Sequence, residues 1–172
     1  MRRPIFLLTA LLWCGQSLAD VPITIKGTIL EPVCTVTGED DGSTVDISFG
    51  EVNLEDVGSS TAEQPINLKV SCDNPAPSGK TLKMYVHPTS NGSVGPNVLG
   101  TSLSNLGIAL AAGTDGSAPL NLDTWIPVVG IDTDVDEPVG QVILKARLVT
   151  PSASSLQAGT FTAAANLVMS YQ

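Results

Sequence analysis

Basic side chains are scarce in this sequence. Lys and Arg together number 8, against 17 Asp and Glu, over 172 residues. Nucleic acids and anionic membrane surfaces attract proteins that cluster Lys and Arg, so this balance argues against both kinds of partner. We therefore expect no nucleic-acid partner, and the acidic excess by itself names no other.

The motifs of common enzymes are also missing. The sequence contains no Gly-x-Ser-x-Gly elbow, no His-Glu-x-x-His helix and no Walker loop. The only histidine, His87, stands beside Pro88 at the end of an apolar-alternating run. A general base needs a positioned nucleophile and an orienting partner, so we interpret His87 as a structural residue. Trp125 taken alone is no sugar-binding platform. We predict that the chain is not an enzyme and has neither a cofactor nor a small-molecule substrate.

No apolar run is long enough to cross a membrane. Two arginines near the N-terminus precede a short apolar run over residues 5–13, and Ser17 and Ala19 place small residues at both cleavage-determining positions. A membrane anchor would need about 20 consecutive apolar residues. We interpret residues 1–19 as a secretory signal peptide, cleaved before Asp20. The exported chain would then keep 153 of the 172 residues and, with two arginines fewer, a net charge of −11.

Metal ligands are few as well. The acidic segments over residues 38–43 and 130–138 lack the Asp, Gly and Glu spacing of an EF-hand loop, so we interpret them as solvated turns. Removal of the signal peptide leaves two cysteines, Cys34 and Cys72. Two cysteines and one distant histidine are too few ligands for a zinc site. An even pair in an oxidising compartment indicates a disulfide, which would stabilise the fold by about 4 kcal/mol in the chain-entropy model.

Long helical patterns and internal repeats are absent, whereas short β-type runs are frequent. Runs rich in Val, Ile, Leu and Thr alternate with turn segments of Gly, Pro, Asn, Asp and Ser, which is typical of an all-β protein. Their spacing predicts one domain with an immunoglobulin-like sandwich of two antiparallel sheets. The expected strands span residues 23–30, 33–37, 44–49, 66–72, 81–87, 106–111, 122–129, 139–149 and 160–171.

The C-terminal segment is ambiguous by propensity alone, because its alanines favour a helix. From Phe161 to Tyr171, however, apolar residues occupy every second position, with Val168 as the one strong misfit. This alternation favours a strand.

Both ends of the exported chain are thus predicted to be strands. Residues 21–29 carry Ile, Val or Gly at every second position, and the last strand reaches the final residue. Such a sandwich would have an exposed edge, and a groove where a further strand would lie. Exposed apolar edges invite pairing with another chain. The N-terminal strand, tethered at one end only, has the pattern to enter such a groove.

A set of motifs runs the length of the expected exported chain: the alternating N-terminal extension with Gly27, PVCTV and INLKVSC around the two cysteines, ISFGEV, LGIAL, Gly159 as the fourteenth residue from the C-terminus, and the penultimate Tyr171. Together these features resemble the pilin subunits that the chaperone–usher pathway of Gram-negative bacteria assembles. The resemblance is closest to the minor tip subunits of P-type and S-type pili, the adaptors that link an adhesin to the rest of the fibre.

The resemblance implies an immunoglobulin-like fold that lacks its final strand. A periplasmic chaperone lends the missing strand, and the N-terminal extension of the next subunit later replaces it; this donor-strand complementation is an established case of β-strand addition. The resemblance makes residues 20–31 the donor-strand extension and residues 32–172 the pilin domain. Gly27 would let the two backbones approach closely. The side chains that would fill a neighbour's groove are Val21, Ile23, Ile25 and Ile29.

At the other end of the chain, the resemblance implies a strand that borders the groove and meets the chaperone. Leu167, Met169 and Tyr171 would contribute to this edge, the carboxylate of Gln172 would bind basic residues of the chaperone, and Gly159 would relieve backbone crowding at a bend. The implied partners are the periplasmic chaperone, the outer-membrane usher and adjacent pilus subunits, among them a tip adhesin. The implied location is a fimbrium on the cell surface, reached through the periplasm.

Two alternatives remain open at this point. The first is a secreted or periplasmic β-sandwich binding module that is complete on its own, with residues 21–30 paired inside its own domain. The second is a pilin that itself binds a host receptor, although 153 residues leave no room for a separate lectin domain. The position in the pilus, as an adaptor, a rod subunit or a terminator, also stays open. A terminator differs by lacking an accessible groove pocket, which is a property of the tertiary structure.

Overall fold

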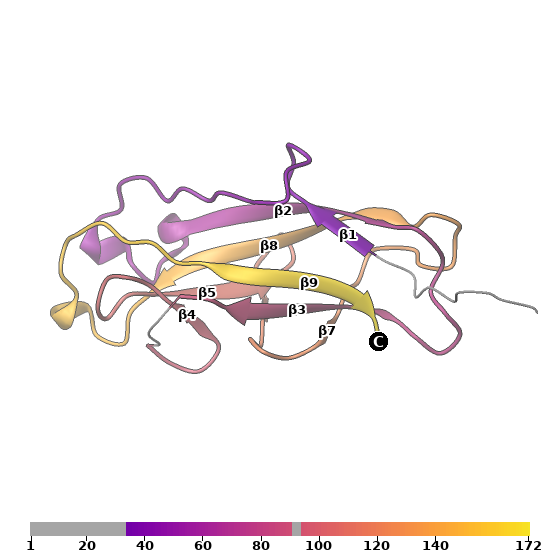
Figure 1. The fold of residues 1–172 in the computed structure, drawn as a ribbon. Helices are drawn as coiled ribbons and strands as arrows, with labels where there is room; N and C mark the ends of the chain where they lie inside the picture. Colours follow the sequence, from indigo (N-terminus) through magenta and orange to yellow (C-terminus); the bar gives the residue numbers. More distant parts are fainter. Residues whose placement is uncertain (1–33, 91–93) are drawn as a thin grey trace, which may run out of the picture. The chain divides into compact units, whose positions relative to one another are not determined.

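Two antiparallel sheets pack face to face in the computed structural model, which describes residues 34–90 and 94–172 (Figure 1). The predicted signal peptide over residues 1–19 and the predicted donor-strand extension over residues 20–31 lie outside the described residues. The same holds for the strand expected over residues 23–30.

The larger sheet has the strand order β1-β2-β8-β5-β4, and β6 pairs with β5 beside this path. All of its ladders are antiparallel, and β2 and β8 form the longest pair. The bounds of its strands are Cys34–Thr37 (β1), Glu63–Cys72 (β2), Val98–Gly100 (β4), Gly107–Ala112 (β5), Ala118–Pro119 (β6) and Val139–Val149 (β8).

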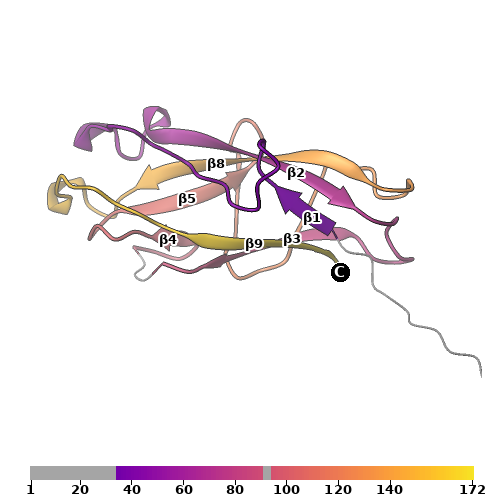
Figure 2. The ribbon, with the colours of Figure 1, turned by 45° about the horizontal axis from the view of Figure 1, so that its top comes forward.

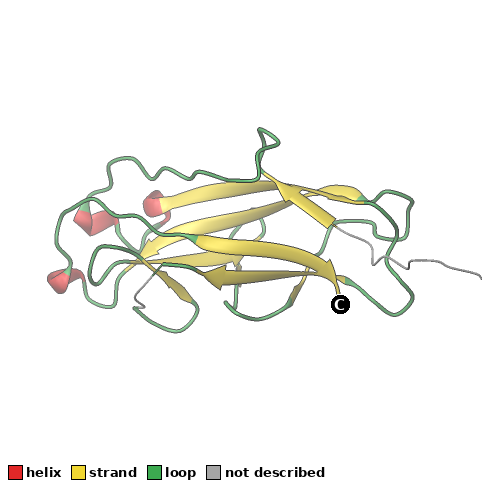
Figure 3. Ribbon diagram, viewed as in Figure 1, coloured by secondary structure: helices red, strands yellow, loops and turns green. Residues whose placement is uncertain are grey.

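The smaller sheet has the order β7-β3-β9, so that β9 forms one of its edges. Its strands are Leu82–Pro88 (β3), Ile126–Pro127 (β7) and Ala165–Tyr171 (β9). The helices among the described residues are three short 3-10 turns, at Leu54–Asp56, Ser60–Ala62 and Ala153–Ser155 (Figure 3). The all-β class predicted from the sequence is therefore confirmed.

The core lies between the two sheets and follows the period of two in the strands. Successive side chains of a strand point to opposite faces, so that every second residue can be buried. This pattern is clearest in β3, β8 and the second half of β2. The core residues from these strands are Leu68, Val70, Cys72, Leu82, Met84, Val86, Leu144, Ala146 and Leu148.

The C-terminal strand behaves as the alternation predicts. Met169 and Tyr171 are buried, whereas the misfit Val168 points outward with 51% of its surface exposed. The strand prediction is thus correct over Ala165–Tyr171 and wrong over residues 160–164, which form no ladder.

Two other strand predictions need correction. Residues 44–49 have β-type composition, but they form no strand, because no neighbouring segment of the described chain pairs with them. The strand expected over residues 122–129 shrinks to β7, because Asp123 takes a left-handed backbone with φ 55° and starts a turn. β4 and β6 were not predicted, because they are too short to produce a recognisable period.

Gly107 allows the closest approach of backbone to side chains in the larger sheet. A Cβ at this position would lie 2.4 Å from Val94 Cγ2 and Val98 Cγ1, and 3.0 Å from the carbonyl oxygen of Leu99. We expect Gly107→Ala to lower the free energy of unfolding by about 1 to 3 kcal/mol, the usual cost of overpacking a core. Urea unfolding measures the loss. At Gly95 an added Cβ would meet only Val98 Cγ2, at 4.0 Å, so a similar loss in Gly95→Ala would contradict the explanation.

Candidate functional site: an open groove between the sheets

A groove of about 870 Å³ opens along one side of the sandwich. Its floor is formed by side chains of the hydrophobic core, which come from both sheets and line the groove. In a closed sandwich a further strand would cover these side chains. The floor residues come from β2, β3, β4, β5 and β8 and are Ile66, Leu68, Val86, Leu99, Ile108, Leu110, Leu144 and Ala146.

The two rims of the groove are formed by segments far apart in the sequence. One rim is the segment over residues 43–49, which follows β1, and the other is the segment over residues 161–168, which leads into β9 (Figure 2). Among the described residues, no backbone–backbone hydrogen bond involves residues 43–49, and β9 pairs on one side only, with β3. Both rims therefore offer backbone donors and acceptors to an incoming strand.

The first rim is anchored where it begins. Lys69 Nζ on β2 donates to the carbonyl oxygen of Glu39 at 2.7 Å and to Asp41 Oδ1 at 2.8 Å. Asn67 Nδ2 donates to Glu39 Oε1 at 3.0 Å. These bonds hold the turn after β1 against the outer face of β2, so the acidic segment that we interpreted as a solvated turn also positions the rim.

An aromatic pair joins the two rims near the start of the second one. The rings of Phe49 and Phe161 lie 5.9 Å apart between centroids, at an interplanar angle of 55°. Phe49 stands in the segment that we expected to be a strand, and Phe161 was assigned to the last strand. The sequence carries no signal that these two rings meet, because their contact depends on how the sheets are placed.

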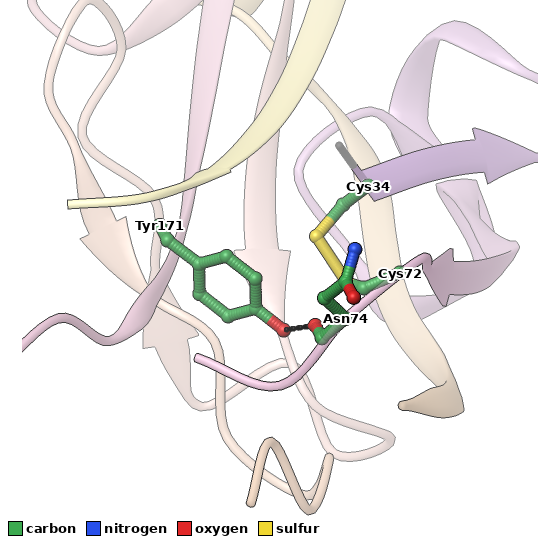
Figure 4. The surroundings of a disulfide bond; sticks show 4 residues. All are labelled: Cys34, Cys72, Asn74 and Tyr171. Atoms are coloured by element: carbon green, nitrogen blue, oxygen red, sulfur yellow. Dashed lines mark hydrogen bonds between the residues drawn. A yellow bond between two sulfur atoms is a disulfide. The ribbon is translucent and has the colours of Figure 1, made fainter. Parts of the chain in front are cut away.

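The disulfide lies at the other end of the site, beside the end of β9. Cys34 and Cys72 are direct partners in the β1–β2 ladder, with their Cα atoms 4.0 Å apart. The Tyr171 hydroxyl donates to the carbonyl oxygen of Asn74 at 3.1 Å, close to the disulfide (Figure 4). The predicted disulfide is therefore present, and it ties β1, which leads to the first rim, to the core strand β2.

The residues expected at the groove edge fall into different environments. Leu167 lines the groove, whereas Met169 and Tyr171 are buried in the core and do not line it. Burial also raises the pKa of the Tyr171 hydroxyl. The backbone of Gln172 exchanges two hydrogen bonds with Thr81, at 2.9 and 3.1 Å. Gly159 precedes the second rim, and a Cβ there would lie 3.2 Å from Leu103 Cδ1.

The described residues offer little for other kinds of site. Within residues 34–90 and 94–172, no three His, Cys, Asp or Glu side chains come together as metal ligands would. No helix in that part of the chain is long and apolar enough to cross a membrane.

Comparison with known proteins identifies the family of the chain. The family model described as fimbrial protein matches residues 23–172. The chain is 36% identical over 122 residues to the minor fimbrial protein PrsF of Escherichia coli, covering 71% of this chain and 70% of PrsF. It is 35% identical over 122 residues to the fimbrial adapter PapF of Escherichia coli, with the same two coverages.

Solved pilus subunits share the fold. The P pilus adaptor subunit PapF matches with a TM-score of 0.53 and 24% identity, over 84% of this chain and 100% of that chain. The P pilus rod subunit PapA matches with a TM-score of 0.53 and 18% identity, over 81% of this chain and 99% of that chain. The resemblance noted in the sequence is confirmed: the chain belongs to the fimbrial protein family and is a structural subunit of a chaperone–usher fimbrium on the bacterial surface.

Proposed function

We propose that this chain is a minor adaptor subunit that receives a β-strand in its groove and donates its own residues 20–31 to a neighbouring subunit. The observation that carries the proposal is the open groove of about 870 Å³, with an apolar floor and two rims whose groove-facing edges pair with no strand of the described residues. The similarity to the fimbrial adapter PapF and the minor fimbrial protein PrsF supports the adaptor position over that of a rod subunit.

The chemistry of the groove suits an extended segment with apolar residues at every second position. An extended strand would hydrogen-bond to the free edge of β9 and place alternate side chains on the apolar floor. In the proposed donor strand, Val21, Ile23, Ile25 and Ile29 have this spacing. Four such side chains contribute roughly 1.5 to 3 kcal/mol each, on the order of 6 to 12 kcal/mol before ordering costs. Gly27 would sit where the backbones come closest.

The proposal includes the steps before assembly. Residues 1–19 would direct export to the periplasm, where a chaperone strand first fills the groove and meets Leu167. Basic residues of the chaperone would bind the carboxylate of Gln172 in a charge-assisted hydrogen bond. An outer-membrane usher would then exchange the chaperone strand for that of an adjacent subunit. None of these assembly steps requires the chain to catalyse a reaction, which agrees with its membership of the fimbrial protein family.

The proposal is tested with the chain shortened to residues 32–172 and made without a chaperone. We expect this protein to aggregate by itself, because its groove exposes the core. A synthetic peptide of residues 20–31, which carries the proposed donor pattern, should keep it monomeric and give it a cooperative urea transition.

The control peptide has the same composition in an order that destroys the alternation of apolar residues. Rescue by the ordered peptide alone supports strand donation. If the shortened chain were a stable monomer that bound neither peptide, its groove would need no added strand and the proposal would be wrong. A chain of residues 20–172 that was a stable monomer without a chaperone, with residues 21–30 paired inside its own domain, would instead favour the sandwich that is complete on its own.

A further inference from the structure

The outward face of the β7-β3-β9 sheet carries an aromatic cluster that the groove does not use. Leu82, Met84 and Val86 of β3 point into the core, so Tyr85 and His87 point outward. The Trp125 ring, just before β7, lies 5.3 Å from the Tyr85 ring between centroids. The His87 ring lies 6.5 Å from the Tyr85 ring between centroids and is nearly parallel to it, at 13°.

One carboxylate ties this cluster together. Asp123 Oδ1 accepts from the Tyr85 hydroxyl at 3.2 Å and lies 2.5 Å from His87 Nδ1. The backbone N–H of Asp123 donates to the carbonyl oxygen of Val86 at 2.9 Å, and its φ of 55° is uncommon for a residue other than glycine. The hydrogen bonds from His87 and Tyr85 lower the pKa of Asp123, which is therefore ionised at neutral pH. A strained residue is thus held so that it presents a fixed carboxylate.

The cluster is open to solvent. The exposed fraction is 57% for the His87 side chain, 52% for the Asp123 side chain and 37% for Trp125. Among the described residues, no hydrogen bond engages His87 Nε2 or Asp123 Oδ2. The surface thus combines an apolar ring face with hydrogen-bonding atoms at its border, and both are available to a ligand.

The charged side chains on this face indicate what kind of ligand the cluster favours. Lys83 points outward from the same strand, two residues before Tyr85, so a positive side chain accompanies the carboxylate of Asp123 on this face of the sheet. The whole chain, in contrast, has 8 basic and 17 acidic residues. A surface that carries charges of both signs gives a strongly charged ligand no net electrostatic attraction. A pyranose ring fits better, because it is neutral and has an apolar face bordered by hydroxyl groups.

We propose that Tyr85, His87, Asp123 and Trp125 bind a neutral hexopyranose unit of a glycan. The apolar face of the sugar ring packs on Trp125, and its hydroxyl groups donate to Asp123 Oδ2 and hydrogen-bond with His87 Nε2. The sequence alone presented Trp125 as a single aromatic residue. The fold supplies the second ring and the carboxylate that make a platform of it.

The chain contains its own reporter for this site. Trp125 and Trp13 are the only tryptophans, and Trp13 lies within residues 1–19. In the protein spanning residues 20–172, bound to a donor peptide without tryptophan, emission therefore comes from Trp125 alone. We expect a saturable change of emission with the methyl glycoside of galactose, glucose or mannose, at about millimolar concentration because so few contacts are made.

Three variants test the residues. Asp123→Asn and Tyr85→Ala should each weaken binding about tenfold or more, as expected from losing a charged acceptor or a packed ring. Asp136→Asn is the matched control, an exposed acidic residue in another loop, and should bind as the wild type does. Circular dichroism checks that each variant is folded. Ligand-observed NMR follows Trp125→Ala, which lacks the reporter and should lose binding.

Three results would overturn the proposal. The first is no saturable response to any of the three glycosides. The second is unchanged affinity in Asp123→Asn and Trp125→Ala, which would place the sugar elsewhere. The third is a response to tetramethylammonium in place of the glycosides, which would make the cluster a cation site.

Discussion

Replacing Ile23 and Ile25 together with aspartate is expected to abolish the joining of this subunit to its neighbour. Both side chains would point into the neighbour's groove, where aspartate would leave charges without partners in apolar surroundings. The loss of two buried isoleucines costs roughly 3 to 6 kcal/mol, and each buried unpaired charge adds several kcal/mol more. Every 1.4 kcal/mol is about tenfold in affinity, so the joint should weaken by at least a thousandfold.

The measurement is the amount of this subunit in purified fimbriae, together with its amount in the periplasm bound to the chaperone. The first should fall below detection and the second should stay unchanged, because the subunit's own groove is intact. Thr24→Asp is the matched control: Thr24 lies between the two isoleucines and would point away from the groove. Equal loss of incorporation in Thr24→Asp and in the double variant would show that residues 20–31 do not act as an alternating strand.

Removing the disulfide is expected to have the second largest effect. Cys34 and Cys72 are separated by 38 residues, and the chain-entropy model gives about 4 kcal/mol for a loop of that length. The bridge also holds β1 to β2 at the start of the segment that becomes the first rim. We therefore expect Cys34→Ser/Cys72→Ser to lose about 4 kcal/mol of unfolding free energy and to bind a donor peptide more weakly.

Urea unfolding of the peptide-bound chain, with and without a thiol reductant, measures this effect. The reductant should destabilise the wild type as much as the double substitution does. It should not affect the double variant of residues 20–172, because the third cysteine of the sequence, Cys14, lies outside that range. A loss below about 1 kcal/mol would show that the β1–β2 ladder holds this end without the covalent bond.

The sequence was most informative where the relevant interactions are local in the chain. Alternation over residues 139–149 matches β8 at both ends, and the alternation before Tyr171 correctly excluded a helix for β9. Burial on every second residue is encoded within a strand itself, so these elements could be predicted without knowing their partners. The pairing of Cys34 with Cys72 was equally accessible, because the only other cysteine of the sequence, Cys14, lies in the predicted signal peptide.

The sequence misled where a segment's state depends on a partner. Residues 44–49 have the composition of a strand, yet they form a groove rim, because a strand needs a neighbour to hydrogen-bond with. Residues 122–129 were expected to be one strand. That prediction was wrong, because Asp123 has a left-handed backbone and its N–H donates to the carbonyl oxygen of Val86 on β3.

The sequence alone therefore determined the β-class, the main strands with their inward faces, the disulfide and the resemblance to pilins. Only the tertiary structure decided that core side chains from five strands form the floor of an open groove, and that Phe49 meets Phe161 across it. It also decided that Trp125, Tyr85, His87 and Asp123 share one outer surface. The physical reason is the distance along the chain over which each feature is encoded. Periodicity and cysteine number can be read within the sequence itself. The groove and the cluster arise from contacts between distant segments, which only the packing of the sheets brings together.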